Sequence, residues 1–145
     1  MHPKIFHAQL DQPRLIAALA AAERNTSGKI YVYVSHRPIA DALAGARKRF
    51  AKLGLSRLHD ERASVLIYLA PRTHKFAILG DTAIHERCGE AFWNQLAEAL
   101  SRDLKAGDPT MALLNTISAL EATLAEHFPP PRRTYRGTLT HLRVL

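Results

Sequence analysis

The feature that most constrains the fold is a short, unbroken apolar run, Val65-Leu66-Ile67-Tyr68-Leu69. A run of this length bounded by polar and turn residues is typical of a strand at the centre of a sheet. A tight connection, Pro71 to His74, leads to a second run, Phe76 to Leu79, which predicts an antiparallel hairpin. A further strand is expected over Lys29 to Ser35, where aliphatic and aromatic side chains alternate, so that both of its faces are covered.

Helical periodicity fills most of the remaining chain. Asp11 and Pro13 are typical of a helix start, and Asn25 to Gly28 of a helix end. A short turn is expected over Thr82 to Cys88. Three further helices are predicted from apolar residues at helical spacing, namely Leu43, Ala46, Phe50 and Leu53; Phe92, Leu96, Leu100 and Leu104; and Leu113, Ile117, Leu120, Leu124 and Phe128. This order predicts the α/β class, as a three-layer α/β/α sandwich with a small mixed β-sheet.

Length and composition indicate one globular domain. The chain has 145 residues, of which 47% are hydrophobic and 23% charged, which excludes wholesale disorder. No apolar run approaches the roughly 20 residues of a membrane span. Cys88 is the single cysteine, which excludes an intramolecular disulfide and fits a reducing compartment. We therefore expect a cytoplasmic protein.

The net charge of +7 is concentrated at the carboxyl end. Residues 129–145 carry four arginines and no acid, so residues 1–128 carry only +3. Three prolines favour an extended exit from the last helix, and Arg132, Arg133 and Arg136 with Tyr135 could follow a phosphate backbone while the ring stacks on a base. The alternatives are a solubilising end, or an edge strand over 138–145 that docks on the domain or on a second copy as a homo-oligomer. Nucleic acid is the less favoured partner.

Several segments resemble the TPM domain family, which is named after a thylakoid lumen phosphatase, a photosystem repair protein and a nematode receptor modulator. The resemblance covers about residues 12–129, which divides the chain into a domain at 1–129 and a basic tail at 130–145. The resemblance implies a sheet covered by helices on both faces, and it places the chain in a short, stand-alone branch of the family. The family carries a phosphatase label, and calcium binding is associated with some of its members. The matching motifs are Glu23-x-x-Thr26-Ser27-Gly28-x-Ile30-x-Val32, Ala46-x-x-x-Phe50-x-x-x-Gly54-Leu55, Val65 to Ala70 with Phe76 to Asp81, and His127-Phe128-Pro129.

Acidic residues are expected at one edge of the sheet. Asp60 and Glu61 precede the second strand, and Asp81 follows the third. If the first two strands are parallel and the third is antiparallel, these three residues lie at the same edge of the sheet. Carboxylates suit Ca²⁺ or Mg²⁺, and a metal there could polarise a phosphoryl oxygen, with Asp60 and Asp81 as catalytic candidates. Against this, Ala63-Ser64 and the hairpin turn Arg72-Thr73-His74 replace groups that could hold a cation in relatives. The alternative is that the two loop acids are solvated and Asp81 caps the next helix.

Basic residues are expected at the opposite edge. His36 and Arg37 follow the first strand, and Arg72 and His74 lie in the hairpin turn. Open α/β sheets bind ligands beyond the carboxyl ends of their parallel strands, so these four residues are candidates for anion binding. The alternative is an ordinary basic loop surface.

The sequence contains no recognisable nucleophile or acid–base pair, and this favours a binding or regulatory module over an enzyme. Its partner would be a protein or a small anionic ligand. A metal-dependent phosphatase acting on phosphate esters is the first alternative. A nucleic-acid accessory protein that works through the tail is the second.

Overall fold

The computed structural model describes residues 6, 8–53, 64–130 and 142–144. Their strands form one mixed sheet in the order β3-β2-β1-β4. Strand β1 is parallel to β2 and to β4, and β2 is antiparallel to β3, so the predicted strand directions are confirmed. The strands are β1 (Lys29–Val34), β2 (Ser64–Ala70), β3 (Lys75–Gly80) and β4 (Leu142–Val144).

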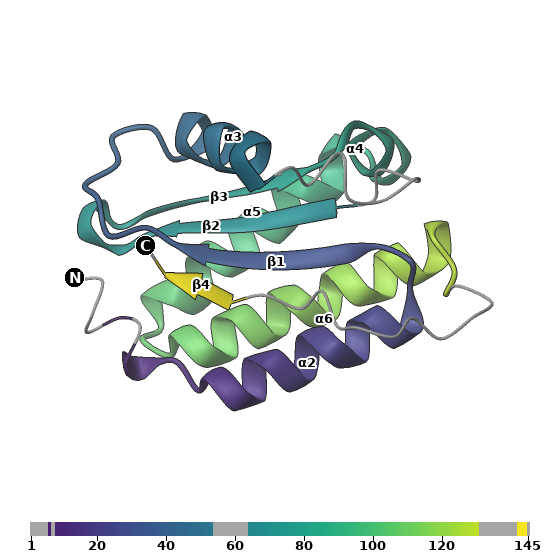
Figure 1. Ribbon diagram of the computed structural model, residues 1–145, viewed down its shortest axis with the longest axis horizontal. Helices are drawn as coiled ribbons and strands as arrows, with labels where there is room; N and C mark the ends of the chain where they lie inside the picture. Colours follow the sequence, from purple (N-terminus) through teal and green to yellow (C-terminus); the bar gives the residue numbers. More distant parts are fainter. Residues whose placement is uncertain (1–5, 7, 54–63, 131–141, 145) are drawn as a thin grey trace.

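Helices cover both faces of the sheet, which confirms the three-layer prediction (Figure 1). One face carries α2 (Gln12–Asn25), α5 (Glu90–Lys105) and α6 (Pro109–His127). The other face carries α3 (Ala42–Leu53). A single 3₁₀ turn, Pro71–Thr73, joins β2 to β3, and the short helix α4 (Thr82–Cys88) follows β3.

Strand β4 lies within residues 138–145, for which an edge strand that docks on the domain was one of the predicted alternatives. Leu142 to Val144 pair with Val32 to Val34 of β1, on the side of β1 opposite to β2. The four tail residues considered for nucleic-acid binding, Arg132, Arg133, Tyr135 and Arg136, lie outside the described residues.

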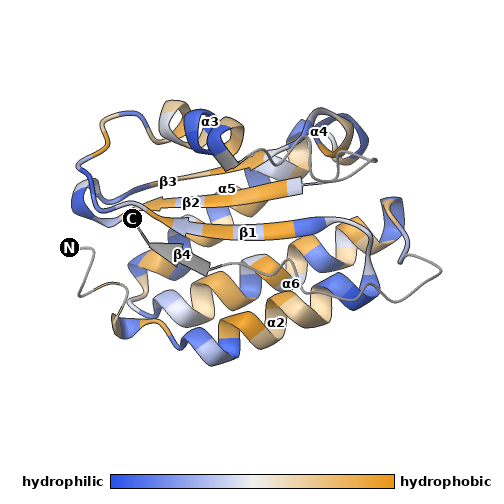
Figure 2. Cartoon of the chain, in the orientation of Figure 1, coloured by the Kyte–Doolittle hydropathy of each residue, from blue (hydrophilic) through white to orange (hydrophobic). Residues whose placement is uncertain are grey.

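The alternation of side chains along β1 and β2 builds a separate core on each face of the sheet. All residues of both strands are buried, and Figure 2 shows these strands as largely hydrophobic. The larger core holds the aliphatic residues of β1 and β2 against α2, α5 and α6. In the smaller core, Tyr33 stacks on Tyr68 with ring centroids 5.5 Å apart, beneath α3.

One position of α3 differs from the prediction. Ala46 is buried and Phe50 packs against the smaller core as expected, but Leu43 is 43% exposed and Ala42 is buried in its place. The reason is a close approach at Gly45, where an added Cβ would lie only 2.9 Å from the Tyr68 hydroxyl. On the same helix, the guanidinium of Arg49 lies 4.4 Å from the centre of the Tyr33 ring.

Candidate functional site at the carboxyl edge of the sheet

The segment around Thr26 is a structural junction. The Thr26 hydroxyl donates to the carbonyl of Phe128 at 2.5 Å and accepts from the amide of Gly28 at 3.0 Å. Ser27 also donates its amide to the Phe128 carbonyl, at 3.1 Å. These bonds tie the end of α2 to the end of α6, so the motif fixes the entry into β1.

The charged residues of the same motif are also structural. Lys29 lies 3.7 Å from Glu23, and both side chains are largely buried. Burial, with a smaller contribution from Glu23, raises the pKa of Tyr31 to about 12. Tyr31 is therefore not poised for proton transfer near neutral pH.

Asp81 lies at the amino edge of the sheet, where it begins α4. Its amide donates to the Ser64 carbonyl at 2.9 Å, and its Oδ1 accepts from the Thr82 amide at 2.7 Å. This is the capping role that the sequence offered as the alternative to metal binding. The second carboxylate oxygen, Oδ2, is buried without a hydrogen-bond partner among the described residues.

The surroundings of Asp81 are aromatic. The Trp93 ring packs on Gly80 so closely that an added Cβ would lie 2.9 Å from it, and His85 stacks on the same ring at 6.1 Å. The indole Nε1 is also buried without a partner in the described part of the chain. Burial of an unpaired polar atom is costly, so Asp81 Oδ2 and Trp93 Nε1 are two unexplained groups at this edge.

The residues described at this edge do not by themselves fit a divalent cation. Ca²⁺ requires six to eight oxygen donors, and Asp81 offers one unused carboxylate oxygen. Among the described residues, no three His, Cys, Asp or Glu side chains converge on a metal position. Asp60 and Glu61 lie outside the described residues, so the predicted metal site stays a prediction.

At the carboxyl edge, the loop after β1 is held against the hairpin turn. Arg72 donates to the His36 carbonyl at 3.5 Å, and Thr73 donates to the Ile39 carbonyl at 2.7 Å. Lys75 donates its ammonium to the Ala40 carbonyl at 2.5 Å. Of the four predicted anion-binding residues, the structure therefore joins Arg72 to the backbone of His36, while the Arg37 side chain is exposed.

His74 lies in a pocket between this turn and the helices. Its backbone has φ of 53°, in the left-handed region, which closes the hairpin. The pocket has a volume of about 310 Å³, at the lower end of the range for small-molecule sites. It is lined by Phe6, Gln9, Leu69, Ala70, Pro71, His74, Lys75, Phe76, Ser101, Leu104, Lys105, Gly107 and Pro109.

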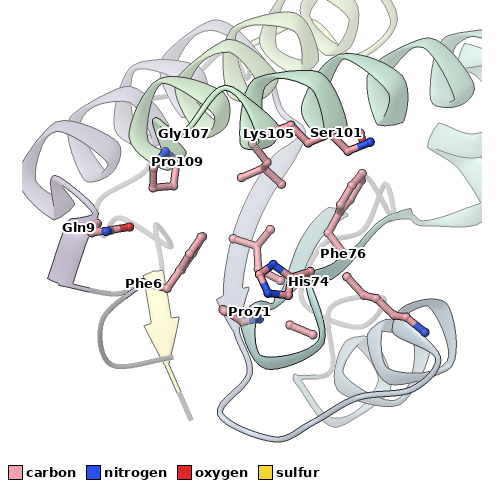
Figure 3. Close-up of a pocket in the computed structure, with 13 residues that line it drawn as sticks. Phe6, Gln9, Pro71, His74, Phe76, Ser101, Lys105, Gly107 and Pro109 are labelled. Atoms are coloured by element: carbon pink, nitrogen blue, oxygen red, sulfur yellow. The ribbon is translucent and has the colours of Figure 1, made fainter. Parts of the chain in front are cut away.

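The pocket combines apolar walls with positive charge. Figure 3 shows Phe6 and Phe76 on opposite sides of it, with His74 between them. Lys105, an exposed residue at the end of α5, also lines the pocket, and none of the described lining residues is acidic. Such a site favours a ligand with an apolar body and a negative charge.

The match to known protein families covers most of the chain. The family model described as the TPM domain matches residues 4–123. The chain belongs to the TPM domain family. The resemblance to this family is confirmed; the match begins earlier than the expected residue 12 and ends at residue 123, before the His127-Phe128-Pro129 motif.

Solved structures with the same fold include two bacterial proteins. The NMR structure of the BA42 protein from the psychrophilic bacterium Bizionia argentinensis has a TM-score of 0.76 and 28% identity, over 83% of this chain and 82% of that one. The N-terminal domain of the cg2496 protein from Corynebacterium glutamicum has a TM-score of 0.50 and 17% identity, over 90% and 74% of the two chains. No curated protein matches the chain.

Two further findings concern this TPM domain. In the part of the chain that the structure describes, none of the helices is long and apolar enough to cross a membrane. Sequence reasoning located the carboxyl edge but missed Phe6, Phe76 and Lys105 as pocket residues. The signal that pointed toward them was the rule that open α/β sheets bind ligands beyond the carboxyl ends of their parallel strands.

Proposed function

We propose that this TPM domain is a ligand-binding module that takes a small amphipathic anion in the carboxyl-edge pocket. The observation that carries the proposal is the composition of the pocket, in which apolar side chains predominate and cationic residues occur without an acid. A medium-chain or aromatic carboxylate has this chemistry. The absence of a recognisable nucleophile in the sequence supports binding rather than turnover.

The two parts of such a ligand would contact different residues. The apolar body would lie between Phe6 and Phe76, where its removal from water contributes about 25 cal/mol for each Å² buried. The carboxylate would lie toward Lys105 and His74. The ammonium of Lys75 already donates to Ala40, so we assign it a smaller part in binding.

Titration with octanoate tests this proposal. We expect saturable binding by calorimetry and a rise in melting temperature that follows ligand concentration. Lys105→Gln should weaken binding about five- to tenfold, since hydrogen bonds to charged groups contribute about 1.5 kcal/mol or less when solvent-exposed. Ser101→Phe should abolish binding, because the added ring fills the pocket.

Arg102→Gln is the matched control, because it removes one positive charge from the same helix at a residue outside the pocket. It should leave octanoate affinity unchanged within twofold. Equal weakening by Arg102→Gln and Lys105→Gln would contradict the proposal, since it would indicate attraction by net charge alone.

A second candidate function is a metal-dependent phosphatase, and the unpartnered Oδ2 of Asp81 favours it. A buried carboxylate oxygen without a protein donor is a natural ligand for a cation. With Asp60 and Glu61 as further ligands, a bound Ca²⁺ or Mg²⁺ would polarise a phosphoryl oxygen.

Metal titration of the Asp81→Asn variant tests this candidate. Asparagine caps helices as well as aspartate does, so the fold is preserved while the carboxylate is lost. If the site binds metal, millimolar Ca²⁺ or Mg²⁺ raises the melting temperature of the wild type but not of the variant, and phosphate-ester hydrolysis is lost with it. Asp41→Asn is the control, because Asp41 caps α3 at the other end of the sheet. Melting temperatures unaffected by metal would eliminate the candidate.

A further inference from the structure

Charge is divided unevenly between the two faces of the molecule. The segments on and beside the α3 face, residues 36–53 and 64–75, contain seven cations and one acid, Asp41. Helices α2, α4, α5 and α6 together contain seven acids and five cations. The seven cations of the α3 face are Arg37, Arg47, Lys48, Arg49, Lys52, Arg72 and Lys75.

The cations on α3 itself are available to a partner. Arg47, Lys48 and Lys52 are exposed, and none of them forms an ion pair with a described residue. They lie on the outer side of the helix that covers this face of the sheet, and part of the α3 ribbon is coloured hydrophilic in Figure 2. Arg49 is excluded from this group, because it lies over Tyr33. The burial of α3 therefore does not require these three charges, and they lie together on one surface.

The residues between these cations are aliphatic and small. Leu43 is 43% exposed, and Ala44 and Ala51 are exposed on the same side of α3. Proteins that bind single-stranded nucleic acid combine positive charge with exposed aromatic rings. Tyr33 and Tyr68 are buried beneath α3, and Phe50 of α3 is partly buried against the same core, so the described residues present no fully exposed ring on this face.

From this pattern we propose that the exposed face of α3, formed by Leu43, Ala44, Arg47, Lys48, Ala51 and Lys52, binds the surface of an anionic lipid bilayer. Its cations would lie among the lipid head groups, and Leu43 would contact the apolar boundary beneath them. Binding of this kind is peripheral and depends on ionic strength. The proposal is independent of the pocket, because no residue of α3 lines it.

Co-sedimentation with vesicles tests the proposal. The full chain should bind phosphatidylcholine vesicles that contain phosphatidylglycerol, should not bind pure phosphatidylcholine, and should be released by high salt. A triple variant, Arg47→Gln with Lys48→Gln and Lys52→Gln, should lose about a hundredfold in affinity, since each basic residue contributes about a factor of five. Leu43→Ser should weaken vesicle binding without changing its dependence on salt.

The matched control removes three charges from the other helices, in Arg14→Gln, Arg24→Gln and Arg102→Gln. All six arginines and lysines are exposed, so both triple variants should fold, with melting temperatures close to that of the wild type. Equal losses in the two triple variants would overturn the proposal, because net charge alone would then explain binding. Binding of single-stranded RNA through the α3 residues, with no binding of vesicles, would also overturn it and assign the face to nucleic acid.

Discussion

Replacement of Ile67 by alanine should lower the free energy of unfolding by about 2–5 kcal/mol. Ile67 is completely buried at the centre of β2, paired with Val32 of β1 and Ile78 of β3. Removal of its side chain leaves a cavity in the larger core, and strands on both sides prevent the backbone from closing it. Urea unfolding measures the loss as a lower midpoint with an unchanged slope.

Ile16→Ala is the control for this substitution. Ile16 is 44% exposed on α2, so the same change of side chain should cost well under 1 kcal/mol. Similar costs for Ile67→Ala and Ile16→Ala would contradict the packing described for the sheet.

The second large effect is expected at Thr26. Thr26→Val keeps the shape of the side chain but removes the hydroxyl, which leaves the Gly28 amide without its acceptor. The Phe128 carbonyl still accepts from the amide of Ser27, so the Gly28 amide is the one group that loses its hydrogen-bond partner. We therefore expect a loss of about 1–3 kcal/mol in the free energy of unfolding, measured by urea or thermal unfolding.

Thr26→Ser separates the hydrogen bonds from the packing. Serine keeps the hydroxyl and removes one methyl group, so its cost should be about 1 kcal/mol. A larger loss for serine than for valine would show that the methyl contact, rather than the hydrogen bonds, holds α2 to α6.

The sheet was predictable because its residues carry a local signal. A strand covered on both faces has apolar residues at every position, as in β2, and only a hairpin is compatible with the short turn after it. Leu43 was wrongly predicted as a buried residue of α3, because leucine is a stronger hydrophobic signal than the neighbouring Ala42. The close contact of Gly45 with Tyr68 selects the smaller residue, and that contact joins segments distant in the sequence.

The pocket was beyond prediction for a related reason. Phe6, Phe76 and Lys105 belong to three separate segments, and each is unremarkable in its own sequence context. Their meeting depends on how α5 crosses the sheet. The sequence contains no local pattern for that crossing, so only the edge of the sheet could be named in advance, from the directions of its strands.

Trp93 is the only tryptophan of the chain, and its position has a practical consequence. It is largely buried near the start of α5, whereas Lys105 lies at the end of that helix, twelve residues or about 18 Å away. Indole fluorescence therefore reports on the amino edge of the sheet and is insensitive to direct contact with a ligand in the pocket. A change in the fluorescence of the unlabelled protein thus indicates that the core has opened, and not that the pocket is occupied.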